Sequence, residues 1–229
     1  MRNILFILTV LGIIACRPHN HNHDSHSHSV VNHDHKSANE HMHNRPFDEL
    51  VAAFESPERD AYQQPDLVLN QFESFTDKKV MDLGAGTGYF SFRIAKKGAH
   101  VIAADVDQRF LNLIQDRIIK EKYPVVEPRL IPTSSPKLSK EEVDMVWVVN
   151  TYHHIENRTE YFSEVRDGLK PNGELVIIDF FKEKDTPGPP KEVKLSADTI
   201  KNELLSAGFS TITIDNDLLE FQYIIRAKK

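Results

Sequence analysis

The stretch Val80-Met81-Asp82-Leu83-Gly84-Ala85-Gly86-Thr87-Gly88 decides the fold of this chain. It begins as a short apolar run typical of a buried strand, and it ends in three glycines that alternate with other residues. Glycine lets the backbone turn sharply and lets a ligand approach the main chain with no side chain in the way. A helix-like segment follows at once and brings free N–H groups to the same place. The stretch therefore predicts a strand, a ligand-binding loop and a helix in succession.

Strand-like and helix-like segments alternate along the rest of the domain. We predict strands at 79–83, 99–105, 125–131, 143–150, 174–179, 209–214 and 220–227, and helices within 46–75 and at 89–97, 108–120, 159–169 and 196–207. Alternation with continuous aliphatic strands predicts an α/β fold whose parallel sheet is covered on both faces. The short Asp215-Asn216-Asp217 link predicts that the last two strands are antiparallel, and Pro128 is expected to interrupt the third strand.

Two acidic residues flank the glycine loop. Asp82 stands two residues before Gly84, and Asp105 ends the second predicted strand. A dinucleotide fold would space its glycines Gly-x-Gly-x-x-Gly and seat a pyrophosphate there, which Asp82 would repel. A carboxylate at the position of Asp105 can accept hydrogen bonds from both hydroxyls of a ribose. The loop is therefore suited to a cationic nucleoside, such as S-adenosylmethionine with its amino and sulfonium groups.

With these residues in place, the segment 79–229 resembles a class I S-adenosylmethionine-dependent methyltransferase. The stretches Asn150-Thr151-Tyr152-His153-His154-Ile155 and Ala207-Gly208-Phe209 are similar to the segments around the family's fourth and sixth strands. The resemblance implies a Rossmann-like, doubly wound sheet of seven strands in the order 3-2-1-4-5-7-6, with strand seven antiparallel. The segment Arg59-Asp60-Ala61-Tyr62-Gln63-Gln64-Pro65 resembles the N-terminal cap of some relatives, and residues 46–78 are the predicted helical cap.

The resemblance also implies which residues hold the cofactor. Asp82 and the glycine-loop backbone would bind the methionine moiety, Asp105 the ribose, and Val106 the adenine. Arg59 would pair with the cofactor carboxylate, the alternative being a solvated helix charge. The stretch Thr133-Ser134-Ser135 departs from the family, which often has an acidic adenine contact there, and a serine hydroxyl would have to substitute. The implied cofactor-binding residues are Arg59, Asp82, Gly84, Ala85, Gly86, Gly88, Asp105, Val106 and Asn150.

Tyr152, His153 and His154 are the candidate catalytic residues, because they follow the fourth predicted strand and would face the methyl acceptor. Asp179, at the end of the fifth strand, is a further candidate. A base is needed only where the nucleophile must lose a proton, and adjacent histidines also occur as one packed and one solvated side chain. The loop 180–194 is predicted to border the acceptor, which we expect to be a small molecule.

The N-terminus resembles a bacterial lipoprotein signal. A twelve-residue apolar run at 4–15 is too short to cross a bilayer as a helix, which needs roughly 20 residues. It ends Ile13-Ile14-Ala15-Cys16, similar to a lipobox, so Cys16 is the expected lipid-bearing residue. This places the chain at the cell envelope, anchored to the membrane. If the leader is not used, or if translation begins at Met42, the protein is cytoplasmic.

Residues 17–45 are polar and rich in histidine, with no periodic apolar pattern, which predicts a disordered linker. His-x-His spacing can present several imidazoles to one ion, and imidazole suits zinc, copper and nickel. The alternative is a solvated linker that binds metal only incidentally. The candidate metal ligands are His19, His21, His23, His26, His28, His33, His35, His41 and His43.

Net charge and the motifs described above leave two hypotheses for the function. The formal net charge of the 229 residues is -6 and no basic arm is present, so nucleic acid is not expected as a partner. The first hypothesis is a methyltransferase that acts on a small-molecule acceptor. The alternative is a membrane-tethered, metal-binding lipoprotein that uses the same fold without turnover. The alternative has one attraction, because S-adenosylmethionine is made in the cytoplasm whereas the leader predicts export.

Overall fold

A single seven-stranded sheet organises the part of the chain that the computed structural model describes, residues 45–123 and 125–229. The predicted leader and the nine histidines of the linker lie outside these residues. The strand order is β3-β2-β1-β4-β5-β7-β6, and β7 runs antiparallel to both of its neighbours. The predicted fold class and strand order are therefore confirmed. The strands are β1 (Lys79–Leu83), β2 (His100–Asp105), β3 (Val126–Leu130), β4 (Val143–Val149), β5 (Leu169–Phe180), β6 (Ser210–Asp215) and β7 (Gln222–Lys228).

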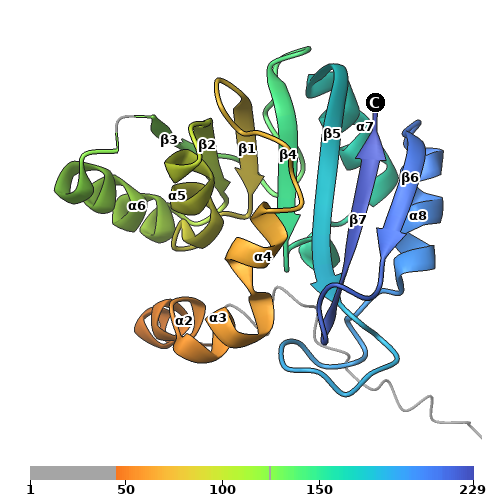
Figure 1. The fold of residues 1–229 in the computed structure, drawn as a ribbon, viewed down its shortest axis with the longest axis horizontal. Coiled ribbons are helices and arrows are strands. Elements are labelled where there is room, and N and C mark those ends of the chain that lie inside the picture. The colour runs from red at the N-terminus through yellow and green to blue at the C-terminus, as the bar shows by residue number, and fades with distance from the viewer. Residues whose placement is uncertain (1–44, 124) are drawn as a thin grey trace, which may run out of the picture. The chain divides into compact units, whose positions relative to one another are not determined.

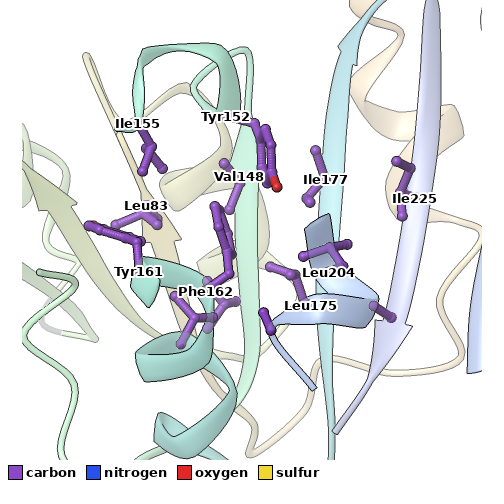
Figure 2. Close-up of a cluster of buried hydrophobic side chains, with 14 of the residues drawn as sticks. Leu83, Val148, Tyr152, Ile155, Tyr161, Phe162, Leu175, Ile177, Leu204 and Ile225 are labelled. Atoms are coloured by element: carbon purple, nitrogen blue, oxygen red, sulfur yellow. The ribbon is translucent and has the colours of Figure 1, made fainter. Parts of the chain in front are cut away.

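Helices cover both faces of the sheet (Figure 1). One face packs against α4 (Pro65–Leu69), α5 (Tyr89–Lys96) and α6 (Gln108–Glu121). The other packs against α7 (Arg158–Gly168) and α8 (Ala197–Ser206), where the aromatic and aliphatic side chains of Figure 2 form the core. No helix among the described residues has the length and apolarity needed to cross a membrane.

The helical prediction for 46–75 resolves into three short helices. These are α2 (Phe47–Phe54), α3 (Pro57–Gln63) and α4. Ser56 caps α3 by accepting a hydrogen bond from the Arg59 N–H, and Pro57 fits the first turn because that turn needs no donor. Figure 1 shows α2 and α3 at the end of the sheet toward which β4 and β5 point. The cap therefore lies at the carboxyl edge of the parallel strands.

Two predictions about the strands were wrong. Pro128 does not interrupt β3 but pairs with Ala103 within it. The strand tolerates proline because β3 is at the edge of the sheet, where one side needs no ladder donor. In addition, β5 begins earlier than the predicted 174, because Leu169 already pairs with Val143 ahead of an irregularity in the register.

Candidate functional site

The glycine loop between β1 and α5 adopts a backbone that only glycine adopts easily. Gly84, Gly86 and Gly88 have φ angles of 78°, 54° and 80°, all in the left-handed region. The Gly84 N–H donates to the Ala104 carbonyl at 2.8 Å, which holds the loop against the end of β2. A Cβ atom on Gly84 would lie 2.4 Å from the Thr151 side chain. The loop is therefore packed against the end of β4, at the point where the strand order reverses.

Asp105 ties the same loop to β2. Its Oδ2 accepts from the Gly86 N–H at 2.8 Å and its Oδ1 from the Asp107 N–H at 2.9 Å. Burial raises the pKa of Asp105. Each carboxylate oxygen can accept more than one hydrogen bond, so capacity remains for two hydroxyls of a ligand. Val106 follows directly and is 49% exposed, an apolar surface beside the carboxylate.

Asp82 and Arg59 place opposite charges under the cap. Asp82 is 3% exposed, and its Oδ2 accepts from the Ser91 hydroxyl at 2.6 Å. Arg59 donates from Nη1 to the Phe54 carbonyl, while its Nε is buried with no partner among the described residues. The guanidinium carbon lies 4.0 Å from the centre of the Tyr89 ring, and burial lowers the pKa of Arg59. Arg59 is therefore a partly buried cation with one buried, unused donor, rather than a solvated helix charge.

Burial raises the pKa of Asp82 to about 6 from 3.8, and this shift predicts a specific pH dependence. Because folding raises this pKa, the stability that Asp82 contributes is present below pH 3.8 and is lost as the pH rises through about 6. The Asp82→Asn variant keeps an acceptor for Ser91 and removes the buried charge. We expect it to melt at a higher temperature than the parent above pH 6, yet to bind S-adenosylhomocysteine more weakly.

Scanning calorimetry across this range, with calorimetric titration of S-adenosylhomocysteine, measures both effects. A variant that is less stable than the parent at neutral pH would contradict the expected cost of the buried charge.

The cap helices touch the glycine loop directly. A Cβ on Gly86 would lie 3.3 Å from the Phe54 ring, and this ring stacks on Phe110 of α6 at 5.7 Å. The Thr87 hydroxyl donates to the Glu55 carboxylate. The cap therefore covers the glycine loop.

Asn150 belongs to a closed ring of three amides that sequence analysis did not find. Its Nδ2 donates to Gln63 Oε1 at 3.1 Å, Gln63 Nε2 donates to Gln222 Oε1 at 2.7 Å, and Gln222 Nε2 donates to Asn150 Oδ1 at 2.5 Å. Gln63 and Gln222 are fully buried, and Asn150 has a φ of 55°. The ring joins α3, β4 and β7. No local signal marks it, because the residues are far apart in the sequence.

His153 is held by Asp179. Its Nδ1 lies 2.9 Å and 3.1 Å from the two oxygens of Asp179, and the two side chains are only 2% and 3% exposed. The His154 ring lies 4.4 Å from that of His153, centre to centre. The structure thus brings together two residues that the sequence identified as separate candidates.

Tyr152 does not face the acceptor region, contrary to its prediction as a catalytic residue. Its ring is fully buried and stacks on Phe162 at 4.6 Å (Figure 2). Its hydroxyl donates to the Glu203 carboxylate at 2.8 Å, and burial raises its pKa. Ser135, one of the two serines in the stretch expected near the adenine, donates to Glu164 at 2.6 Å. Both residues serve helix packing on the face of α7 and α8.

Comparisons with known proteins agree with this geometry. Residues 81–175 match the family described as Methyltransferase domain. The chain is 30% identical over 148 residues to an uncharacterized methyltransferase of Schizosaccharomyces pombe, which covers 64% of this chain and 57% of that protein. It is 30% identical over 104 residues to the tRNA U34 carboxymethyltransferase of Dichelobacter nodosus, covering 45% and 33%. These matches span about half or less of most of the curated relatives.

The fold is shared with solved structures. An S-adenosylmethionine-dependent methyltransferase from Aquifex aeolicus superposes with a TM-score of 0.71 at 23% identity, covering 80% of this chain and 98% of that one. The sheet and its glycine loop define a Rossmann-like fold. Through the match over residues 81–175 and through this shared fold, the chain is similar to S-adenosylmethionine-dependent methyltransferases.

Proposed function

We propose that this protein transfers a methyl group from S-adenosylmethionine to a small-molecule acceptor. The observation that carries the proposal is the partly buried guanidinium of Arg59, whose buried Nε has no partner among the described residues, near the carboxyl of Asp82. An amino-acid ligand has the complementary pair of charges, a carboxylate and an ammonium. The side-chain-free approach at Gly84 and Gly86 also fits a ligand that contacts the main chain.

Each part of the cofactor has a matching group in the site. Arg59 would hold the carboxylate and Asp82 the amino group, while the backbone of Gly84, Ala85, Gly86 and Gly88 would line the methionine moiety. Asp105 would accept from the ribose hydroxyls, Val106 would cover the adenine, and Asn150 would line the pocket. The bound sulfonium supplies an already activated methyl group. The protein's task is to align the acceptor and to exclude water.

The acceptor is proposed to lie beside His153 and His154, bordered by the loop 180–194. A net charge of -6 favours a small molecule over a nucleic acid.

The Arg59→Gln variant tests the proposed function. We expect its affinity for S-adenosylhomocysteine to fall about 10- to 100-fold, since hydrogen bonds to charged groups contribute about 1.5–3 kcal/mol. Binding of 5′-methylthioadenosine, which lacks the amino-acid part, should not change. Calorimetric titration measures both affinities.

Arg93→Gln is the matched control. Arg93 lies 3.9 Å from the centre of the same Tyr89 ring but bonds to Asp60. We expect the affinities for both ligands to be unchanged in this variant. If the parent protein binds neither S-adenosylhomocysteine nor 5′-methylthioadenosine, the methyltransferase proposal is contradicted. Binding with no methylated product from any acceptor would favour the alternative without turnover.

We further propose that residues 17–45 bind zinc, copper or nickel, as the nine histidines in repeated His-x-His spacing support. Zinc titration of the soluble chain, compared with a variant that carries Gln at the nine positions, tests this. Equal uptake by both chains would remove the proposal.

We also propose that Cys16 carries a lipid that anchors the protein at the cell envelope, on the strength of the leader's resemblance to a lipoprotein signal. An alkyne fatty acid fed to cells should label the parent protein but not the Cys16→Ala variant. Equal labelling of both would exclude lipidation at this residue.

A further inference from the structure

His153 and Asp179 stand together at the carboxyl edge of β4 and β5. His153 lies in the short 3-10 helix η1 (Tyr152–His154), which follows β4, and Asp179 is the penultimate residue of β5. Thr151, two residues before His153, abuts the glycine loop at Gly84. On the other side, the loop 181–196 folds back onto Phe180, since a Cβ on Gly188 would lie 2.5 Å from its ring. The pair therefore lies between the cofactor loop and the loop expected to border the acceptor.

The hydrogen bonds of Asp179 orient the imidazole. Oδ1 accepts from the Phe180 N–H at 2.8 Å, and both oxygens face Nδ1 of His153. A carboxylate in this position favours a proton on Nδ1. Nε2 then carries the free electron pair on the far side of the ring, while the hydrogen bonds of the ring to Asp179 use Nδ1.

The charged and phenolic groups near Asp179 form their hydrogen bonds with other partners. Lys194 and Tyr223 both lie close enough to Asp179 to interact electrostatically. The Lys194 ammonium, however, donates to the Thr186 hydroxyl at 2.7 Å, and the Tyr223 hydroxyl donates to the Leu195 carbonyl at 3.0 Å. Asp179 thus keeps its buried carboxylate bonded to His153.

We propose that Nε2 of His153, oriented by Asp179, takes a proton from the acceptor, and that the acceptor belongs to the class whose nucleophilic oxygen or nitrogen carries one. The inference rests on the proposed function. The acceptor atom forms a bond to the methyl carbon as the carbon–sulfur bond breaks, and the electron pair of that bond stays on sulfur. The proton moves to Nε2, so the positive charge passes to an imidazolium beside Asp179. His153 is the proton acceptor and Asp179 a positioning residue.

The tautomer of His153 tests the orientation without any turnover. Long-range ¹H–¹⁵N spectra of the full-length chain with labelled histidines show which ring nitrogen carries the proton, and His153→Ala identifies the signal. We expect the neutral imidazole to carry its proton on Nδ1, and a shift of this tautomer in Asp179→Asn. A proton on Nε2 in the parent protein would overturn the inference.

Turnover tests the acceptor class. Catechol and ethanolamine carry a proton on the nucleophile, whereas dimethyl sulfide does not, and formation of S-adenosylhomocysteine reports transfer to each. We expect the parent to use a proton-bearing probe and His153→Ala to lower kcat by about 10²- to 10⁴-fold, the range of general base catalysis. Added imidazole should restore part of the rate. The affinity for S-adenosylhomocysteine should not change, which also shows that the variant folds.

His100→Ala is the control, because His100 is exposed at the opposite end of the sheet, and it should leave kcat unchanged. Transfer to dimethyl sulfide alone, no transfer to either proton-bearing probe, or an unchanged kcat in His153→Ala overturns the inference. If S-adenosylhomocysteine still binds in those cases, the proposed function stands. Loss of that binding in the parent would instead overturn the proposed function.

Discussion

The Gly84→Ala variant should lose measurable binding of S-adenosylhomocysteine and unfold more easily. Its Cβ would lie 2.4 Å from both Cγ2 and Oγ1 of Thr151, at a φ of 78°. Left-handed strain and overpacking each cost about 1–3 kcal/mol, so we expect roughly 2–6 kcal/mol in total. Because the clash is relieved most easily by moving the loop, part of this cost falls on ligand affinity. Urea unfolding measures the loss of stability, and calorimetric titration measures the loss of ligand affinity.

Two further variants show whether the steric clash or the backbone strain causes the loss of affinity in Gly84→Ala. Gly98→Ala has a comparable φ of 96° but meets its nearest atom only at 3.3 Å, and it lies in the turn before β2. It should lose stability and keep full affinity. Adding Thr151→Gly to Gly84→Ala should recover the part due to the clash but not the backbone strain. Full affinity in Gly84→Ala would show that the loop does not carry the ligand.

The Gln222→Met variant should destabilise the protein by roughly 2–6 kcal/mol. It leaves Asn150 Oδ1 and Gln63 Nε2 without their partners, and each unsatisfied buried group costs about 1–3 kcal/mol. Since Gln63 ends α3, the cap should also become more sensitive to protease than the sheet. Urea unfolding measures the first effect, and limited proteolysis followed by mass spectrometry measures the second.

Gln71→Met provides the matched control for the amide ring. Gln71 is exposed, and its side chain donates to the Leu67 carbonyl of its own segment, so the same substitution should cost less than about 0.5 kcal/mol. The double variant Gln63→Met with Gln222→Met should be less destabilised than the sum of the two single variants, because it removes a donor and its acceptor together. Strict additivity would mean that the ring does not act as a unit.

The predicted elements lie close to the observed ones where local pattern and long-range pairing agree. The apolar run before Gly84 is a strand, and the aliphatic stripe at 108–120 is α6 within one residue. The errors have particular physical causes. Pro128 remains in β3 because the position of that strand at the edge of the sheet is a property of the assembled sheet. Tyr152 is in the core because η1 turns its ring toward Phe162, although it is adjacent in sequence to a buried histidine that meets Asp179.

The glycine loop, the acidic residues on either side of it and the alternation of strands with helices could be predicted from the sequence alone. Glycine spacing and hydrophobic period are local properties, and they predict the sheet and the proposed class of ligand. The closing of the cap over the loop, the amide ring of Gln63, Asn150 and Gln222, and the pairing of His153 with Asp179 were decided only by the tertiary structure. Each depends on side chains between 26 and 159 residues apart, which meet only after parallel strands have aligned their carboxyl ends at one edge of the sheet.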